Sequence, residues 1–318
     1  MDTLPKFDFQ TIDLSSRVKD LVKFRIPTGI IAIDKVVGGG IPAGKLTEIY
    51  GGWSSGKTRL ACHVIAQTQK LGGVGVFADN ERSLDEGLIG LTGIDTDPTK
   101  FIYPDPDTEL TSVENIFRIM QNAVVTLREN NPEGLLTIVW DSVASTPGIQ
   151  ELEGEMGVNT TAMRRAKLIG EGLRRLMTDV YRHKVCLIFI NQIRDRIGIM
   201  YGEKTDTVGG KALKFTASLR LHCKIAGRIK NEKTGELEGY KGKLIVDKSK
   251  ICKPFGVVNF PMYADKPIDK HAGLLDYMSR HGEVLNNKGW YSFPDTPETK
   301  FRESDFPTLY EKRELKGE

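Results

Sequence analysis

Features that would mark a secreted, zinc-bound or membrane-spanning protein are scarce in this sequence of 318 residues. The four cysteines are scattered and form no CxxC pair, which favours buried thiols in a reducing compartment over disulfides or a zinc site. The longest apolar runs have the length of strands, so neither a transmembrane helix nor a membrane partner is expected. The N-terminus begins acidic and resembles neither a signal peptide nor a transit sequence, which makes the cytoplasm the expected location.

Net charge is also small, at +3, so total charge does not by itself indicate binding to nucleic acid. The positive charge is concentrated, however. Residues 160–183 hold six Lys or Arg against two acids, and residues 194–230 hold nine against three. Taken alone, this clustering fits a solvated basic face as well as it fits a surface that binds a polyanion.

Three zones follow one another along the chain. Residues 1–27 form a short arm that is too small for a core of its own. Residues 28–265 alternate strand-like apolar runs with helical patterns, which predicts an α/β fold with a mainly parallel sheet flanked by helices. The strand candidates are residues 45–51, 73–80, 135–142 and 185–192, with an antiparallel extension over 218–227 and 242–251. Residues 266–318 predict a small C-terminal domain of mixed helix and strand.

Residues 51–58 read GGWSSGKT and match the phosphate-binding pattern GxxxxGK[ST]. The segment follows a strand and opens an amphipathic helical stretch, which is the context that this pattern requires and which disfavours an ordinary glycine-rich turn. Its glycines would let backbone N–H groups wrap the phosphates of a nucleotide, Lys57 would neutralise the terminal phosphates, and the Thr58 hydroxyl would bind Mg²⁺. The candidate nucleotide-binding residues of this segment are Gly51, Gly52, Ser54, Ser55, Gly56, Lys57, Thr58 and Arg59.

Two acids stand at the ends of other predicted strands. Asp141 ends an apolar strand, where a carboxylate can reach the Mg²⁺ ion, and Ser142 is expected to join its hydrogen-bond network. Glu81 follows the second strand, where a carboxylate could polarise the water that attacks the γ-phosphate. A helix cap is the alternative for Asp141, and a surface acid at a helix start is the alternative for Glu81.

The order of these motifs resembles that of bacterial RecA recombinases. The matching segments are GGWSSGKT, FADNERSLD, VWDSVAS, ELEGEMG, LIFINQIRDRIGIMYG and VGGKALKFTASLRL. The resemblance runs from about Thr28 to Phe293, and INQIR followed by GGKALKF is far more specific than the phosphate loop. It implies a RecA-like P-loop NTPase core that uses ATP and Mg²⁺, forms a helical filament on single-stranded DNA, and exchanges strands with homologous double-stranded DNA.

The resemblance also implies roles for residues outside the phosphate loop. Glu81 matches the catalytic glutamate, which acts together with Lys57. Gln192 matches a glutamine that senses the γ-phosphate and couples it to a DNA-binding loop. Lys248 and Lys250 match lysines that reach the nucleotide of a neighbouring subunit in the filament. Without the resemblance, Gln192 would be a plain polar residue at a strand end, and the lysines would only guard a sheet edge.

Two segments are implied to bind DNA. The first leads into a helix that carries an apolar stripe from Ala166 to Val180 and a basic opposite face. The second covers residues 194–210, where a Met–Tyr pair could stack on bases and paired glycines could admit the phosphate backbone. Burial of the Met–Tyr pair is the alternative, which the polar flanks disfavour. The candidate DNA-binding residues are Lys167, Arg174, Arg175, Arg194, Arg196, Met200, Tyr201, Gly209, Gly210 and Lys211.

Some positions depart from the family pattern. Leu88 replaces the tyrosine that the family stacks on adenine, although the nucleotide-binding Asp85 is retained, and Trp53 replaces a typically acidic residue. These departures indicate a divergent member that acts in the cytoplasm of a bacterium or of a phage-infected host. Two other functions are carried as alternatives, namely a RecA-like accessory ATPase without strand exchange and a hexameric helicase or switch ATPase of the same fold.

Overall fold

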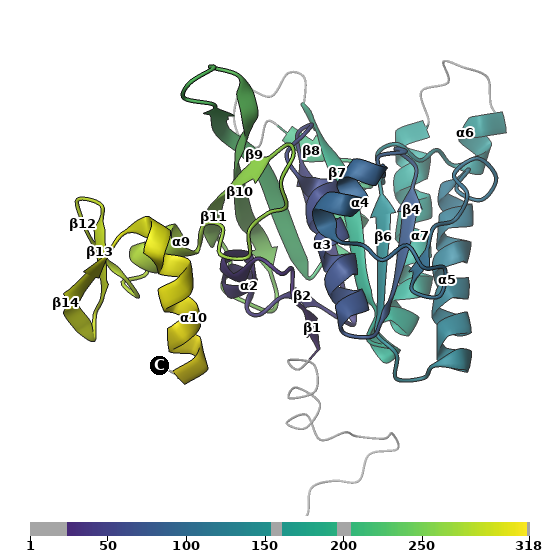
Figure 1. The fold of residues 1–318 in the computed structure, drawn as a ribbon. Helices are drawn as coiled ribbons and strands as arrows, with labels where there is room; N and C mark the ends of the chain where they lie inside the picture. Colours follow the sequence, from purple (N-terminus) through teal and green to yellow (C-terminus); the bar gives the residue numbers. More distant parts are fainter. Residues whose placement is uncertain (1–23, 154–160, 196–204, 317–318) are drawn as a thin grey trace, which may run out of the picture.

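A computed structural model describes residues 24–153, 161–195 and 205–316 of the chain (Figure 1). In the described residues the largest sheet has the strand order β11-β10-β9-β3-β7-β6-β4-β5, with β8 pairing β7. Its strands are β3 (Lys45–Gly51), β4 (Val74–Asp79), β5 (Phe101–Ile102), β6 (Leu136–Asp141), β7 (Cys186–Asp195), β8 (Thr205–Thr207), β9 (Leu219–Lys230), β10 (Leu237–Ser249) and β11 (Val257–Tyr263). Neighbours from β9 to β5 are parallel, whereas β10 and β11 are antiparallel. The predicted α/β fold with an antiparallel extension is confirmed.

Helices cover both faces of this sheet (Figure 1). They are α2 (Ile31–Val37), α3 (Lys57–Lys70), α4 (Glu86–Thr92), α5 (Val113–Asn130), α6 (Ile149–Glu153), α7 (Thr161–Arg182) and α8 (Gly210–Thr216). Buried residues of the central strands alternate between two apolar clusters. In β6, Ile138 and Trp140 join the cluster that contains α5 and α7, whereas Val139 joins the cluster that contains α3. This alternation is the two-residue period of a strand, so each face of the sheet has its own core.

The longest helix, α7, has the predicted amphipathic arrangement. Ile169, Leu173, Leu176 and Val180 are buried against the sheet and α5. Residues of the opposite face, including Arg174 and Arg175, are exposed. The basic residues of this segment therefore lie on the surface because the apolar stripe fixes the rotation of the helix.

The carboxyl ends of the parallel strands meet at one edge of the sheet. Gly51 at the end of β3 is paired with Gln192 of β7, and Asp79 at the end of β4 is paired with Asp141 of β6. Strand β3 and the next strand in sequence, β4, are separated by β7 and β6, so α3 crosses over between them. Such a change of direction opens a crevice at the carboxyl ends, which is where α/β sheets bind ligands.

The two ends of the described chain pack on this core. Strand β1 (Arg25–Ile26) pairs with β2 (Ile41–Pro42), and residues 1–23 of the predicted arm over 1–27 lie outside the described residues. The C-terminal elements, yellow in Figure 1, are α9 (Leu274–Arg280), the sheet β12 (Leu285–Asn287), β13 (Trp290–Phe293) and β14 (Thr296–Phe301), a 3₁₀ turn (Glu303–Asp305) and α10 (Phe306–Lys316). The sequence predicted one helix and one strand here. Phe301 and Phe306 belong to the same apolar cluster as α3, so this part packs continuously with the core.

No helix in these described ranges is both long enough and apolar enough to cross a membrane.

A close helix contact gives a test of the core packing. Gly172 on α7 lies against the ring of Phe117 on α5, and a Cβ at this position would overlap that ring. Gly172→Ala is therefore expected to lower the free energy of unfolding by about 1–3 kcal/mol, because overpacking forces the two helices apart. Gly90→Ala is the matched control, since Gly90 is exposed on α4 and a Cβ there meets nothing within 4 Å. The control should gain about 0.5–1 kcal/mol in urea unfolding, and equal effects of the two substitutions would contradict the packing.

Candidate nucleotide-binding site

The phosphate-loop sequence forms a tight turn between β3 and α3. Gly56 directly precedes α3 and has a left-handed backbone with φ of 85°, which glycine adopts without strain. A Cβ at Gly51 would collide with the backbone oxygen of Cys223 on β9, so this position also requires glycine. The N-terminus of α3 therefore opens at the edge of the sheet, and a helix N-terminus attracts anions.

Lys57 is the buried cation of this loop. Its Nζ donates a hydrogen bond of 2.8 Å to the backbone oxygen of Gly52, and Ser55 Oγ donates one of 2.8 Å to the same oxygen. Burial lowers the pKa of Lys57, while the nearby Asp141 and Glu81 carboxylates act in the opposite direction. Further negative charge from a polyphosphate would favour the ammonium form, so the loop is arranged to bind an anion.

Thr58 and Asp141 provide a hydroxyl and a carboxylate that fit a metal ion. Thr58 Oγ1 donates a hydrogen bond of 2.6 Å to Asp141 Oδ2, and the other carboxylate oxygen of Asp141 is buried without a protein partner. Among the described residues, no group of three or more His, Cys, Asp or Glu could hold a metal by itself. A donor set this small suits Mg²⁺, which completes its octahedron with water and nucleotide phosphate oxygens.

Asp141 is fully buried and lies close to other carboxylates. Burial is the main cause that raises the pKa of Asp141 to about 7; the charges of Glu81 and Asp79 act in the same direction, and the hydrogen bond from Thr58 and the charge of Lys57 act against them. A divalent cation beside this carboxyl would favour its charged form. Deprotonation of Asp141 and metal binding are therefore coupled.

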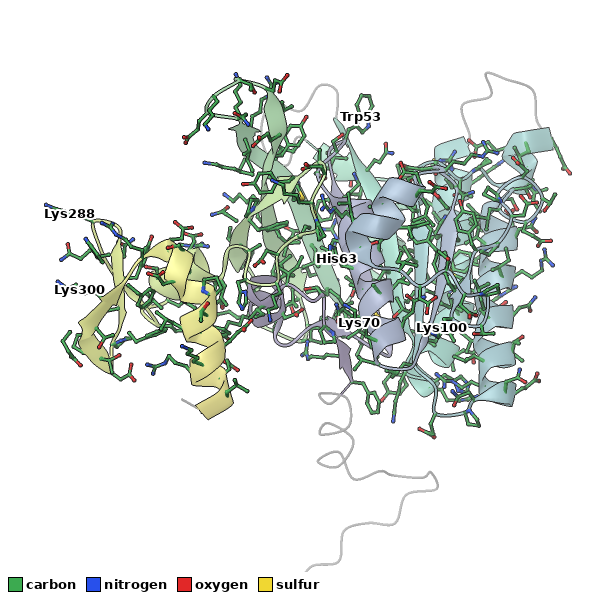
Figure 2. The ribbon with its side chains drawn as sticks, in the orientation of Figure 1. Trp53, His63, Lys70, Lys100, Lys288 and Lys300 are labelled. Atoms are coloured by element: carbon green, nitrogen blue, oxygen red, sulfur yellow. The ribbon has the colours of Figure 1, made fainter. Side chains whose placement is uncertain are left out.

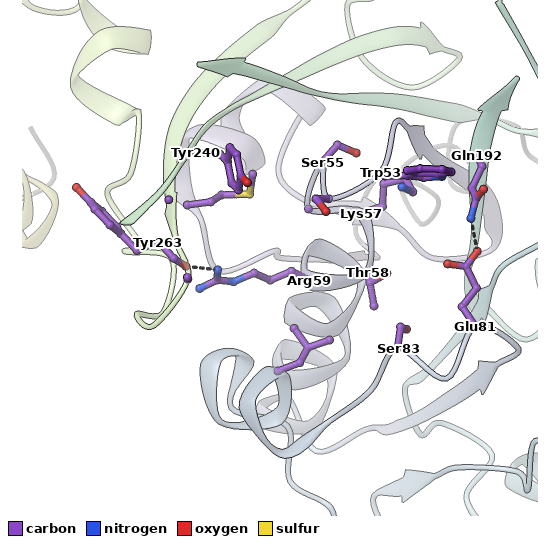
Figure 3. Close-up of a pocket in the computed structure, with 16 residues that line it drawn as sticks. Trp53, Ser55, Lys57, Thr58, Arg59, Glu81, Ser83, Gln192, Tyr240 and Tyr263 are labelled. Atoms are coloured by element: carbon purple, nitrogen blue, oxygen red, sulfur yellow. Dashed lines mark hydrogen bonds between the residues drawn. The ribbon is translucent and has the colours of Figure 1, made fainter. Parts of the chain in front are cut away.

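Glu81 contacts Gln192 beside the loop (Figure 3), and it also contacts Ser142, although Ser142 and Gln192 lie 61 and 111 residues beyond Glu81 in the chain. Gln192 Nε2 donates a hydrogen bond of 2.7 Å to Glu81 Oε1, and the Ser142 hydroxyl donates to the same oxygen. Glu81 is exposed, so water can reach its carboxylate. Trp53 projects from the loop and is 83% exposed (Figure 2), and it lines the same pocket as Gln192 (Figure 3).

A second buried carboxylate, which the sequence analysis did not single out, shapes the segment that carries Glu81. Asp79 accepts hydrogen bonds from the backbone amides of Ser83 and Leu84, at 3.1 and 3.0 Å, and from the Tyr103 hydroxyl at 3.1 Å. The Ser83 hydroxyl also donates to Asp141 Oδ2 at 3.3 Å. Asp79 ends a predicted strand just as Asp141 does, and that shared position was the signal for it.

The sequence analysis also did not identify the residues that form the wall of the site opposite the phosphate loop. A pocket of about 510 Å³ extends from the phosphate loop to β10 and β11. Its wall on that side is formed by Gly239, Tyr240, Met262, Tyr263 and Ala264. Arg59 joins this wall to α3, because its guanidinium donates a hydrogen bond of 2.7 Å to the backbone oxygen of Tyr263 (Figure 3). No motif marks these residues, which reach the loop only because the antiparallel strands extend the sheet beside it.

The remaining nucleotide candidates divide between two places. Leu88 lines the pocket, whereas Asp85 caps α4 by accepting a hydrogen bond of 2.7 Å from the Leu88 amide. The pocket lining does not include Lys248 or Lys250. Their ammonium groups instead donate to backbone oxygens near the end of α8, with Lys248 Nζ 2.5 Å from the oxygen of Lys214 and Lys250 Nζ 3.1 Å from that of Phe215.

The described DNA-binding candidates lie on α7 and α8. Lys167, Arg174, Arg175 and Lys211 are exposed, and Gly209 and Gly210 form the left-handed turn that begins α8. The two helices touch closely, since a Cβ at Gly210 would lie 3.0 Å from that of Ala166, and one at Gly170 would lie 3.2 Å from that of Ala212. Arg196, Met200 and Tyr201, together with the side chain of Arg194, fall outside the described residues.

Comparison with known proteins finds one family for most of this chain. A family model described as the RecA N-terminal domain matches residues 10–269. "Protein RecA" of Aquifex pyrophilus is 38% identical over 291 residues, which cover 91% of this chain and 79% of that protein. The proteins of the same name from Gloeothece citriformis and Aquifex aeolicus are 36% and 39% identical, over 87% and 85% of this chain and over 75% and 74% of their own lengths.

The buried Asp141 carboxyl gives a test in the absence of nucleotide. Its pKa is about 7 in the folded protein against 3.8 for an ordinary aspartate, so between these values the folded state holds a proton that the unfolded state has released. Stability from this group therefore falls as the pH rises from about 4 to about 7. The Asp141→Asn variant should gain more stability over the parent at about pH 8 than at about pH 5.

Urea unfolding at both pH values measures this difference. Asp107→Asn, at an exposed aspartate, controls for the loss of one negative charge. A gain that is the same at both pH values would show that burial does not hold the proton on Asp141.

Proposed function

The chain belongs to the RecA family of DNA recombination and repair proteins, and from that premise we propose that it is a DNA-dependent ATPase with ATP and Mg²⁺ bound at the phosphate loop. One observation carries the proposal. The hydrogen bond from Gln192 to Glu81 joins the nucleotide site to strand β7, which continues directly toward the segment expected to contact DNA. A change in the position of β7 caused at either site can therefore affect the other site.

Roles within the nucleotide site follow from charge and position. Lys57 and the amides at the start of α3 hold the phosphates, while Thr58 and Asp141 hold Mg²⁺, which neutralises charge on the phosphate oxygens. Tyr240, Tyr263 and Leu88 line the part of the pocket that is available to the nucleoside. Aromatic and apolar side chains there suit a flat base.

Glu81 is proposed to orient the attacking water. Its carboxylate is exposed and accepts hydrogen bonds from Gln192 and Ser142 on one oxygen, Oε1, which leaves the other oxygen available to a water molecule. Gln192 is neutral and can exchange its contact with Glu81 for one with a phosphate oxygen. Such an exchange would make water activation depend on the nucleotide state and on the position of β7.

Single-stranded DNA is the proposed activator and homologous double-stranded DNA the second substrate, in the bacterial cytoplasm. The glycine turn before α8 packs against α7, whose exposed basic residues lie on the same helix, so cationic side chains are available near this turn for binding phosphates. Lys248 and Lys250 lie outside their own pocket, which suits contacts with the nucleotide of the next subunit in a helical filament.

Neither alternative function is favoured. A hexameric helicase or switch ATPase would share with this chain only its nucleotide motifs, whereas the similarity to RecA proteins covers 91% of the chain. An accessory ATPase that binds DNA or a partner filament without strand exchange could use the same basic residues, and it is disfavoured because the family model and the relatives that match most of the chain are those of RecA proteins. The proposed domains remain those of the sequence analysis, with an oligomerisation arm over 1–27, the ATPase and DNA-binding core over 28–265 and a C-terminal domain over 266–318.

Rates of ATP hydrolysis with and without single-stranded DNA test this proposal. The parent should be strongly stimulated by DNA. Lys57→Ala should lose nucleotide binding or turnover, whereas Glu81→Ala should bind nucleotide and lose hydrolysis by about a hundredfold or more, because only water activation is removed. Glu86→Ala, at an exposed acid on α4, is the control and should match the parent. A Glu81→Ala variant with the parent rate would place the base elsewhere.

Salt dependence of DNA binding tests the proposed basic face. Replacing Arg174 or Arg175 with alanine should weaken binding to single-stranded DNA of every sequence, and should flatten the slope of log K against log salt by roughly 0.7 per lost phosphate contact. Arg118→Ala removes an exposed arginine from α5 and should leave the slope unchanged. Equal slopes for all three variants, measured by fluorescence anisotropy, would remove α7 from the DNA site.

A further inference from the structure

A chain of hydrogen-bonded polar side chains runs from β7 across β3 to β9 and β10, and its members on the first three strands are buried. Asn191 Nδ2 on β7 donates a hydrogen bond of 2.9 Å to Glu48 Oε1 on β3. The other oxygen of Glu48 accepts a hydrogen bond of 2.5 Å from Arg220 Nε on β9, and Arg220 donates one of 2.7 Å to Asp247 on β10. Asn191 and Glu48 are completely buried and Arg220 is 8% exposed.

Asn191 also contacts one residue beside each of the two proposed binding regions, the nucleotide site and the DNA-binding turn. Its Nδ2 donates a second hydrogen bond, of 2.7 Å, to the backbone oxygen of Val208, and its Oδ1 accepts one of 3.0 Å from the backbone amide of Gln192. Val208 immediately precedes the Gly209–Gly210 turn, and Gln192 contacts Glu81. One buried amide therefore lies between the γ-phosphate side of the nucleotide site and a turn proposed to bind DNA.

Glu48 makes this arrangement rigid. A fully buried carboxylate is stable in the interior only when its oxygens are hydrogen-bonded and its charge is balanced. Arg220 balances the charge, and Asn191 satisfies the remaining oxygen. The side chain of Asn191 is thus fixed to β3 by Glu48, and any shift of the β7 backbone at Gln192 must move Val208 or break one of these hydrogen bonds.

We infer that Asn191 is a positioning residue that couples the nucleotide site to the Val208–Gly210 turn. Gln192 exchanges contacts with Glu81 and a phosphate, the backbone at 191–192 shifts with it, and the Asn191 amide transmits that shift to the carbonyl of Val208. Chains of hydrogen bonds between rigid elements can carry energetic coupling between two sites. This inference rests on the proposed function, because it concerns the regulation of the same ATP and DNA sites.

The coupling is measured at equilibrium, as the affinity for fluorescent oligo-dT with and without a non-hydrolysable ATP analogue. The parent should bind the DNA more tightly with the analogue. In Asn191→Ala this tightening should shrink by about tenfold, while affinity for the analogue without DNA stays near that of the parent. A folded Asn191→Ala protein that keeps the full tightening overturns the inference.

Thr137→Val is the matched control for the loss of a buried hydrogen bond. Thr137 is completely buried on β6, and its hydroxyl lies 2.5 Å from that of Thr68 on α3. It stands at the opposite end of β6 from Asp141, so its removal lowers stability without touching either proposed site. The control should keep the tightening of the parent, and an equal loss in the control would show that general destabilisation causes the effect.

A double substitution separates stability from coupling. Asn191→Asp combined with Glu48→Gln conserves the net charge and lets a glutamine amide at 48 donate to a carboxylate at 191, but it provides no donor for the Val208 oxygen. We expect its urea midpoint to lie closer to that of the parent than the midpoint of Asn191→Ala, with the tightening still lost. Recovery of the tightening would exclude the Asn191–Val208 contact as the link. A parent that does not bind single-stranded DNA overturns the proposed function as well.

Discussion

The hydrogen bond between Thr58 and Asp141 is the contact on which the nucleotide site depends. It joins the first turn of α3 to the end of β6. Strand β7 lies between β3 and β6 in the sheet, so α3, which follows β3, reaches past β7 to make this contact. The bond can form only if β3, β7 and β6 lie parallel and end at the same edge. The two apolar clusters on the faces of the sheet fix the strand order, and they thereby also fix the position of the groups proposed to bind the metal ion.

The same edge concentrates negative charge in an apolar protein interior. Asp79 and Asp141 are completely buried, Glu81 lies beside them, and Lys57 is the nearby cation of the loop. Their hydrogen-bond donors are largely uncharged, being hydroxyl groups and backbone amides, so the carboxylates are oriented without being neutralised. The neighbouring carboxylates of this site would be balanced by a divalent cation, and they add to the effect of burial, which is the main cause of the raised pKa of Asp141.

The sequence predicted the phosphate loop and Asp141 from local patterns, because each stands in or directly after a strand that a short apolar run identifies. Glu81 and Gln192 also stand at the ends of such strands, but their roles were assigned only through the resemblance to the RecA family. The wall formed by Tyr240 and Tyr263 could not be predicted in this way, because it depends on the register of an antiparallel pair beside β3. In the C-terminal sheet only the strand that corresponds to β13 was predicted. Strands β12 and β14 are short and mostly exposed, so the sequence shows little apolar pattern there.

Small residues allow the two proposed ligand regions to share one strand. Gly170 on α7 lies against Ala212 on α8, and Gly210 lies against Ala166, so α8 sits close to α7 and its glycine turn is held near the end of β7. Larger side chains at these contacts would move the turn away from the strand, and the Asn191 amide could then no longer reach the Val208 carbonyl at 2.7 Å. Helix packing on the DNA side and hydrogen bonding on the nucleotide side are therefore parts of one geometric constraint, set by the position of β7 in the middle of the sheet.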